Sequence, residues 1–179
     1  MVWTPPLTAI PGSVLTAAEW NTSVRDNLNE TAPALATQQS TIFVGSGVNS
    51  IVERLPDGEA ITTQEDTTST SPDDLATPGP TVTVTTGPNA FIHFRAGLSN
   101  SSAGATSIVG YDTSGATTLA ANIARAISSD GLAANSRMRM GTTVFTDGLT
   151  PGSNVFQMKY WVSGGTGTFL HRQISVVPL

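Results

Sequence analysis

The sequence predicts a mainly β protein, in which an extended N-terminal arm and one α-helix precede a C-terminal antiparallel β-sandwich of the jelly-roll type. Three observations indicate this fold class. From Thr81 onward, apolar and polar residues alternate with a period of two, as in strands with one buried face. Small polar residues occupy the polar positions, and 17 Gly and 11 Pro supply turns. The clearest helix signal lies near residue 16.

Residues 1–15 form the first predicted element, an extended arm. Its sequence, MVWTPPLTAIPGSVL, contains three prolines and a glycine. Each proline lacks an amide donor and disfavours a helical conformation in the residue before it. The arm carries six large apolar side chains, which are Val2, Trp3, Leu7, Ile10, Val14 and Leu15. Because these are too few to form a core, we expect the arm to lie on another surface.

A helix is predicted to begin directly after the arm. Thr16 is a favourable N-cap, and Glu19 stands three residues later, which completes a capping box. Leu15 precedes the cap and Trp20 follows in the first helical turn, so the pair fits a hydrophobic staple. These local signals fix the start of the helix without reference to the rest of the chain.

The predicted helix carries one narrow apolar stripe. Trp20, Val24 and Leu28 recur at a spacing of four, and Pro33 is expected to end or bend the helix near residue 32. A helix of about 16 residues is marginal alone in water. The stripe is therefore expected to pack against copies of itself in an oligomer, against a docking surface, or back on the chain's own β domain.

Three segments are expected along the chain. Residues 1–38 form an anchoring arm and helix, residues 39–80 form a transitional stalk or linker with short strands, and residues 81–179 form the β-sandwich. Within the sandwich, about five to eight short strands separated by turn residues are typical of a sandwich or jelly roll. A short helical or irregular insert is expected over residues 119–127.

Composition excludes several classes of function. The net charge is −5, and the eight Lys and Arg residues are scattered, whereas nucleic-acid binding needs clustered cations. No apolar run approaches the length of about 20 residues that a membrane helix needs. The N-terminus lacks the basic start and apolar core of a signal peptide. Neither nucleic acid nor membrane is expected as a partner, and synthesis in a cytoplasm is expected.

No motif for catalysis or for metal binding is present. His93 and His171 lie on alternating segments without metal-ligand spacing. The acidic pairs at residues 65–66 and 73–74 lack the spacing of a calcium loop. No Gly-x-Ser-x-Gly elbow occurs. We therefore expect a non-enzymatic protein with no cofactor, no metal site and no catalytic residues.

Several segments of the chain resemble proteins of tailed-phage virions. Residues 3–5, 12–22 and 25–28, with the sequences WTP, GSVLTAAEWNT and RDNL, resemble a signature near the N-terminus of minor tail proteins, head fibres and capsid decoration fibres. The further segments that resemble this family are residues 74–84, 149–154, 159–160, 164–169 and Arg172. Together these segments are spread along most of the chain, from residue 3 to residue 172.

The resemblance implies a virion protein that assembles in the host bacterial cytoplasm, with capsid, neck or tail proteins as partners. It also implies a homo-oligomer, with a trimer favoured. Because the chain has no internal repeat, a short accessory protein is favoured over a long receptor-binding fibre. Large aromatic anchors dominate protein interfaces. The expected anchoring or oligomer interface consists of Trp3, Leu7, Leu15, Trp20, Val24 and Leu28.

The rival hypothesis is an adhesion module that binds carbohydrate or protein on the host surface. Phe91, Tyr111 and Trp161 are its candidate recognition residues. Alternatively, these three residues pack in the core or between subunits. A polysaccharide-cleaving enzyme would need converging carboxylates, and no spacing in the sequence indicates such a pair.

Overall fold

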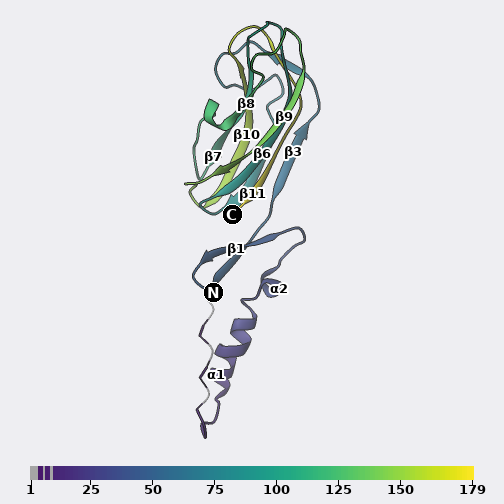
Figure 1. Ribbon diagram of the computed structural model, residues 1–179. Coiled ribbons are helices and arrows are strands. Elements are labelled where there is room, and N and C mark those ends of the chain that lie inside the picture. The colour runs from purple at the N-terminus through teal and green to yellow at the C-terminus, as the bar shows by residue number, and fades with distance from the viewer. Residues whose placement is uncertain (1–3, 6, 9) are drawn as a thin grey trace. The chain divides into compact units, whose positions relative to one another are not determined.

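The structure is a computed structural model that describes residues 4–5, 7–8 and 10–179. It divides into two compact units, Met1–Leu55 and Pro56–Leu179. The first unit contains the N-terminal helical segments and one β-hairpin, and the second contains two antiparallel β-sheets and a short 3-10 helix (Figure 1). The predicted fold class, a helix followed by an antiparallel sandwich, is confirmed.

The helix of the N-terminal unit begins where the capping box predicts. Helix α1 spans Ala17–Trp20, and the Thr16 hydroxyl accepts a hydrogen bond from the Glu19 amide at 3.2 Å. The Glu19 carboxylate in turn accepts from the Thr16 amide at 2.8 Å. These reciprocal bonds satisfy two amides that a helix start leaves unpaired, so the predicted capping box is confirmed.

Beyond α1 the helix widens and ends earlier than predicted. A π-helical segment, η1, spans Asn21–Asp26, and the helical residues end at Leu28. The Thr31 hydroxyl donates to the Leu28 carbonyl at 2.7 Å, which closes the helix end. The predicted end near residue 32 is wrong, because Pro33 lies in the first turn of a separate helix, α2, Ala32–Leu35, where its missing amide costs nothing.

A short β-hairpin completes the N-terminal unit. Strand β1, Ile42–Gly47, pairs antiparallel with β2, Ser50–Arg54. The Thr37 hydroxyl donates to the Glu53 carboxylate at 2.6 Å, so the end of α2 is tied to β2. This hydrogen bond is the largest cause that lowers the pKa of Glu53 below its ordinary value. Short strands were predicted in this region of the chain.

The C-terminal unit consists of two sheets. The five-stranded sheet has the order β3-β11-β6-β9, with β4 also paired to β11, and the four-stranded sheet has the order β5-β10-β7-β8. The strands are β3 Asp57–Ile61, β4 Glu65–Thr67, β5 Thr81–Thr86, β6 Ala90–Asn100, β7 Ser107–Gly115, β8 Ala126–Ser128, β9 Met138–Thr146, β10 Gly152–Val162 and β11 Gly167–Pro178.

Strand pairing identifies the sandwich as a jelly roll. The pairs are nested along the chain: β7 with β8, β6 with β9, β5 with β10, and finally β3 and β4 with β11. All of these pairs are antiparallel. A long hairpin rolled so that successive pairs alternate between two sheets gives this order, which is the double-sheet arrangement of a jelly roll.

The sandwich includes residues that were predicted to be linker. Strand β3 pairs with β11 over Asp57–Ile61, and β4 pairs with β11 at Gly167–Phe169. The predicted boundary between residues 80 and 81 is therefore replaced by one between residues 55 and 56. Strand β3 has the sequence DGEAI and is mostly exposed, so it lacks the apolar alternation by which a buried strand is recognised.

The core lies between the two sheets and follows the predicted alternation. On β6 the residues Ala90, Ile92, Phe94, Ala96 and Leu98 have no exposed surface, whereas Phe91 is 42% exposed on the opposite face. Strand β10 places Phe156, Met158 and Tyr160 in the same core. The expected insert over residues 119–127 contains a short 3-10 helix, η2, Ile123–Arg125.

Candidate attachment surface

The N-terminal arm lies on the helix of its own unit, and Asn27 holds it there. The Asn27 side chain is 4% exposed. Its Oδ1 accepts from the Thr4 amide at 2.9 Å, and its Nδ2 donates to the Thr4 carbonyl at 3.0 Å. Because one side-chain amide offers both a donor and an acceptor, Asn27 pairs with the Thr4 backbone as a neighbouring strand would.

Two further contacts complete this attachment of the arm. Asn27 Nδ2 also donates to the Ser23 carbonyl at 2.9 Å, which fixes the side chain on the helix. Three residues after Thr4, the Leu7 amide donates to Ser23 Oγ at 3.2 Å. Sequence reasoning missed Asn27, since an asparagine between charged and apolar helix residues gives no signal that it is buried.

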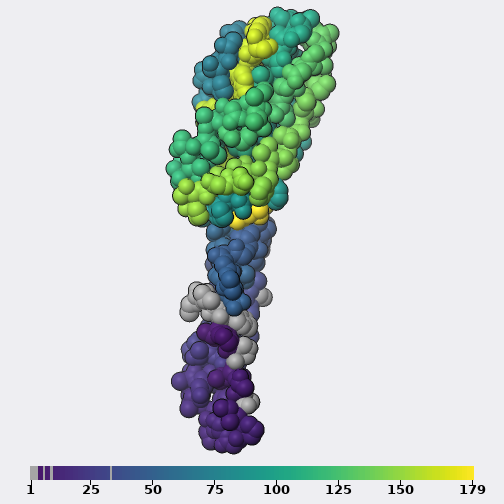
Figure 2. Space-filling model, turned by 60° about the vertical axis from the view of Figure 1, so that its left-hand side comes forward, coloured from purple at the N-terminus to yellow at the C-terminus, as the bar shows by residue number. Residues whose placement is uncertain are grey.

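With the arm in place, apolar side chains remain open to solvent. Leu7 is 41% exposed, Leu15 50%, Trp20 55% and Leu28 58%. We call these four residues the attachment surface. They lie in the N-terminal unit, in the part of the chain coloured purple in Figure 2. Contiguous exposed apolar side chains are typical of an interaction surface, and Leu7 and Leu15 line one hollow.

Two residues of the expected anchoring interface, Val24 and Trp3, are not part of the attachment surface. Val24 is partly buried and lies in the π-helical turn from Asn21 to Asp26. Trp3 lies outside the described residues. The predicted stripe with a spacing of four is therefore interrupted at its middle member.

A hollow of about 200 Å³ lies beside the attachment surface. Leu7, Ile10 and Leu15 form its apolar wall, and Thr8, Ser13 and Glu19 line the remainder. Ile10 is 69% exposed. An engineered apolar cavity of about 150 Å³ holds a benzene molecule, so this hollow has room for one large apolar side chain of a partner.

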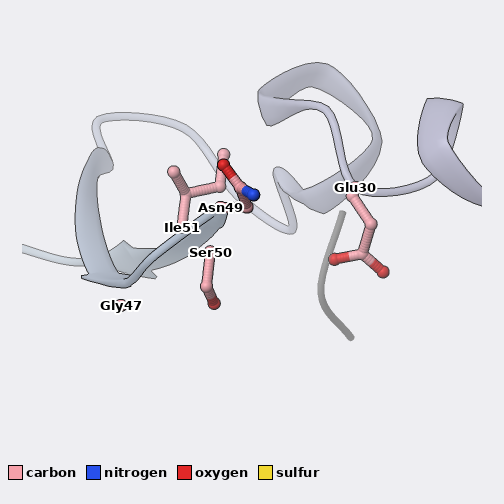
Figure 3. Close-up of a pocket in the computed structure, with 5 residues that line it drawn as sticks. All are labelled: Glu30, Gly47, Asn49, Ser50 and Ile51. Atoms are coloured by element: carbon pink, nitrogen blue, oxygen red, sulfur yellow. The ribbon is translucent and has the colours of Figure 1, made fainter. Parts of the chain in front are cut away.

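A larger pocket lies in the same unit. It measures about 430 Å³ and is lined by Glu30, Gly47, Asn49, Ser50 and Ile51. Figure 3 shows the Glu30 carboxylate coming from the helical side, and Asn49, Ser50 and Ile51 from the hairpin. Among the described residues that line this pocket, Glu30 carries the single carboxyl group, whereas most glycosidases use two.

The three candidate recognition residues differ in their exposure. Phe91 is 42% exposed, and its ring lies 5.2 Å from that of Phe145, which is 51% exposed. Tyr111 has no exposed surface, and its hydroxyl hydrogen bonds with Thr146 Oγ1 at 2.6 Å. Trp161 is 7% exposed. Tyr111 therefore packs in the core between the sheets, whereas Trp161 is buried outside that core.

The burial of Trp161 has an identifiable cause. The residue lies on the face of β10 opposite the core residues Tyr160 and Met158, where the alternation predicts exposure. A Cβ built on Gly110 would meet both Trp161 Cη2 and the Arg125 carbonyl at 3.1 Å, so the ring and the η2 segment lie together over this glycine. Sequence reasoning missed Phe145, although its place opposite Phe91 in the ladder follows once the strand register is known.

His93 and Asp74 of the sandwich have structural partners. His93 Nδ1 lies 3.1 Å from Thr143 Oγ1, and Asp74 pairs with Lys159 at 3.0 Å. Within the described ranges, no group of three or more His, Asp or Glu residues is arranged to hold a metal ion. No helix in those ranges is long and apolar enough to span a membrane.

Comparisons with known proteins gave only distant structural likenesses. No model of a known protein family matches the chain, and no curated protein matches its sequence. The infectious bursal disease virus VP2 subviral particle is 15% identical with a TM-score of 0.46, over 81% of this chain and 41% of that one. The infectious bursal disease virus Gx strain structure is 14% identical with a TM-score of 0.43, over 75% and 36%.

The chain thus spans less than half the length of these two structures. Both TM-scores lie below 0.5, so the jelly-roll assignment rests on the strand pairing described above.

Proposed function

We propose that this chain is a non-enzymatic structural protein of a tailed-phage virion. In this proposal the N-terminal unit attaches to the capsid, neck or tail or to further copies of the chain, and the jelly roll is displayed outward. The observation that carries the proposal is the attachment surface: four large apolar side chains stay 41–58% exposed in a unit that packs separately from the sandwich. The resemblance of residues 3–28 to virion proteins supports the same role.

The energy available from this surface favours attachment as an oligomer. Full burial of one large apolar side chain contributes about 1.5–3 kcal/mol. Burying the exposed halves of the four side chains contributes about 4 kcal/mol, and the freedom lost on association costs at least as much. One copy alone would therefore bind weakly. The resemblance favours a trimer. Once one copy of an oligomer is attached, the other copies are held at a high effective concentration near the same surface, so the oligomer binds more tightly than one copy.

Replacing Trp20 by alanine is expected to reduce incorporation of the chain into virions by about tenfold or more, since aromatic anchors dominate interface energies. The measurement is the amount of chain in purified virions relative to the major capsid protein, by quantitative mass spectrometry. The matched control is Ile123→Ala, which removes another exposed apolar side chain, 64% exposed, from the sandwich.

The outcomes of this experiment are distinct. The control is expected to incorporate at the wild-type level, and both variants are expected to keep the wild-type thermal unfolding transition of the jelly roll. Equal incorporation of Trp20→Ala and wild type would refute the role of the attachment surface. Absence of the wild-type chain from virions would refute the virion assignment itself.

One observation favours a second candidate, an adhesion module for the host surface. The Phe91 and Phe145 rings form an exposed aromatic pair on the outer face of the five-stranded sheet. Exposed aromatic side chains serve as anchors in recognition sites. Binding of the full-length chain to immobilised host-surface glycans or proteins, lost on Phe91→Ala, would support this candidate, and failure to bind any of them would oppose it.

A further inference from the structure

A bulge in β11 places an unusual residue on the outer face of the five-stranded sheet. His171 and Arg172 together oppose a single residue of β6, Ala96. The extra residue keeps both Phe169 and Ile174 in the core, although they lie five positions apart. Arg172 turns inward with no exposed surface, and His171 is exposed.

The backbone at this bulge is strained. His171 has a φ of 49°, in the left-handed region that residues with a Cβ rarely adopt. Strained residues that the surrounding structure holds in place are concentrated at binding and catalytic sites. The outer face around His171 is therefore a place to look for a ligand.

Two arginines lie on the same outer face, on the neighbouring strands. Arg95 of β6 stands opposite Gly141, and Arg139 of β9 stands opposite Gly97. In an antiparallel ladder such diagonal residues have Cβ atoms about 7–8 Å apart. Because each arginine faces a glycine, no other side chain of this strand pair separates them. Space is tight here, since a Cβ on Gly141 would lie 2.9 Å from the Cβ of Arg95.

These cationic side chains border a hollow of about 120 Å³, together with Thr62 and Gln173. Arg95 Nε donates to Gln173 Oε1 at 2.7 Å, which orients the guanidinium and leaves its two terminal nitrogens for another acceptor.

Arg172 also lines this hollow and is paired with Glu65, whereas Arg95, Arg139 and His171 have no such carboxylate partner among the described residues. In the described part of the chain, the cations that form ion pairs are Arg25, Lys159 and Arg172. No carboxylate of this part therefore lies within 4.0 Å of the side-chain nitrogens of Arg95, Arg139 or His171. The whole chain has 13 acidic and only eight basic residues. In so acidic a protein, two arginines and a histidine around one hollow favour an external anion as their partner.

We propose that Arg95, Arg139 and His171 form an oxyanion-binding site, which holds a carboxylate, sulfate or phosphate group of an acidic polysaccharide. Arginine presents a planar fork of donors that matches such groups, and an imidazole N–H adds a further donor. The site does not depend on attachment through the N-terminal unit. It gives the adhesion candidate a location and a ligand class.

The rest of the outer face fits an extended sugar chain. Phe91 lies four residues from Arg95 on β6, so the exposed Phe91 and Phe145 rings stand about 13 Å from the arginine along the strand. The hydrogen-bonded His93 and Thr143 side chains lie between them. A polysaccharide of a few sugar units can place one ring on the aromatic pair and its charged group at the arginines.

The test is titration of the full-length chain with three oligosaccharides of equal length, carrying carboxylate, sulfate or phosphate groups, and with a neutral oligosaccharide. Isothermal calorimetry at two salt concentrations measures the affinities. The wild type is expected to bind at least one acidic oligosaccharide, more weakly at high salt, and to bind the neutral one at least tenfold more weakly. The preferred acidic oligosaccharide identifies the oxyanion.

The variants are Arg95→Gln and Arg139→Gln, each expected to weaken binding by about tenfold. The matched control is Arg137→Gln, which removes an exposed arginine that donates to Gln64 Oε1 at 3.0 Å, and is expected to bind as wild type. Phe91→Ala is expected to weaken oligosaccharide binding several-fold while leaving the salt dependence unchanged. All variants are checked for the wild-type unfolding transition.

Three results would overturn the proposal: no binding of any acidic oligosaccharide, equal binding of the neutral one, or unchanged affinity in both site variants. An unchanged affinity in Phe91→Ala would overturn the extended path across the sheet. Incorporation into virions is measured separately, so failure of this site and failure of the attachment surface are distinguishable.

Discussion

Replacing Phe94 by alanine is expected to lower the free energy of unfolding of the jelly roll by about 3–5 kcal/mol, the range for truncating a buried aromatic side chain. Phe94 has no exposed surface. Its ring meets that of Tyr111 edge to face, with centroids 5.5 Å apart, so the contact joins β6 of one sheet to β7 of the other. Truncation would leave a cavity at the centre of the sandwich.

The measurement for Phe94→Ala is denaturant unfolding followed by intrinsic fluorescence. Phe91→Ala is the matched control, because it is the same truncation on the same strand but on the exposed face. Its expected cost is about 1 kcal/mol or less, mainly from the contact with Phe145. Similar losses in the two variants would show that the faces of β6 are not assigned correctly.

Replacing Glu65 by glutamine is expected to destabilise the jelly roll by about 3 kcal/mol at neutral pH, because it leaves a buried charge without its counter-ion. The Arg172 side chain is fully buried, and its Nη1 lies 3.4 Å from Glu65 Oε2. Arg172 also lies over the Tyr160 ring, 5.4 Å from its centroid. The remaining partners of the guanidinium are uncharged oxygens of Thr63 and Thr77.

A double replacement separates lost charge from lost packing. Arg172→Met combined with Glu65→Gln removes both charges and keeps an apolar side chain of similar length, so most of the stability is expected to return. Chemical unfolding of the two single variants and the double variant measures the coupling between the two side chains. Additive losses in the double variant would contradict a stabilising ion pair.

The effect of Glu65→Gln is also expected to depend on pH. Burial raises the pKa of Glu65, but hydrogen bonds from Thr77 and the charge of Arg172 outweigh it and hold the pKa below its ordinary value of 4.5. Because the pKa is lower in the folded state, the carboxylate stabilises the fold above pH 4.5, and this stabilisation is lost as the pH falls through the folded pKa. The difference in stability between wild type and Glu65→Gln should therefore shrink in acid, and a constant difference would contradict this assignment.

Local chemistry made several elements predictable from the sequence. The capping box of Thr16 and Glu19 depends on residues three positions apart, and it forms as predicted. The alternation on β6 and β10 depends on a period of two, and it assigns the buried faces of both strands correctly. The jelly-roll class followed from many short alternating strands. The nested pairing could not be predicted, because the sequence of one strand does not indicate which strand it pairs with.

Other features depended on which segments meet in the folded chain. Arg172 is buried because a bulge turns it inward toward Glu65, more than a hundred positions away in the sequence. Asn27 is buried only because the arm returns to pair with it. The hollow between Arg95 and Arg139 exists only through the register of β6 and β9.

The sequence by itself determined the helix start, the alternating strands, the class of fold and the apolar character of the N-terminal unit, because these follow from periodicity and from contacts between near neighbours. The tertiary structure decided the boundary at residue 56, the burial of Tyr111 and Trp161, and the exposure of the Phe91 and Phe145 pair. Burial depends on what covers a face of a sheet, and in a jelly roll that covering comes from strands and loops distant in the chain.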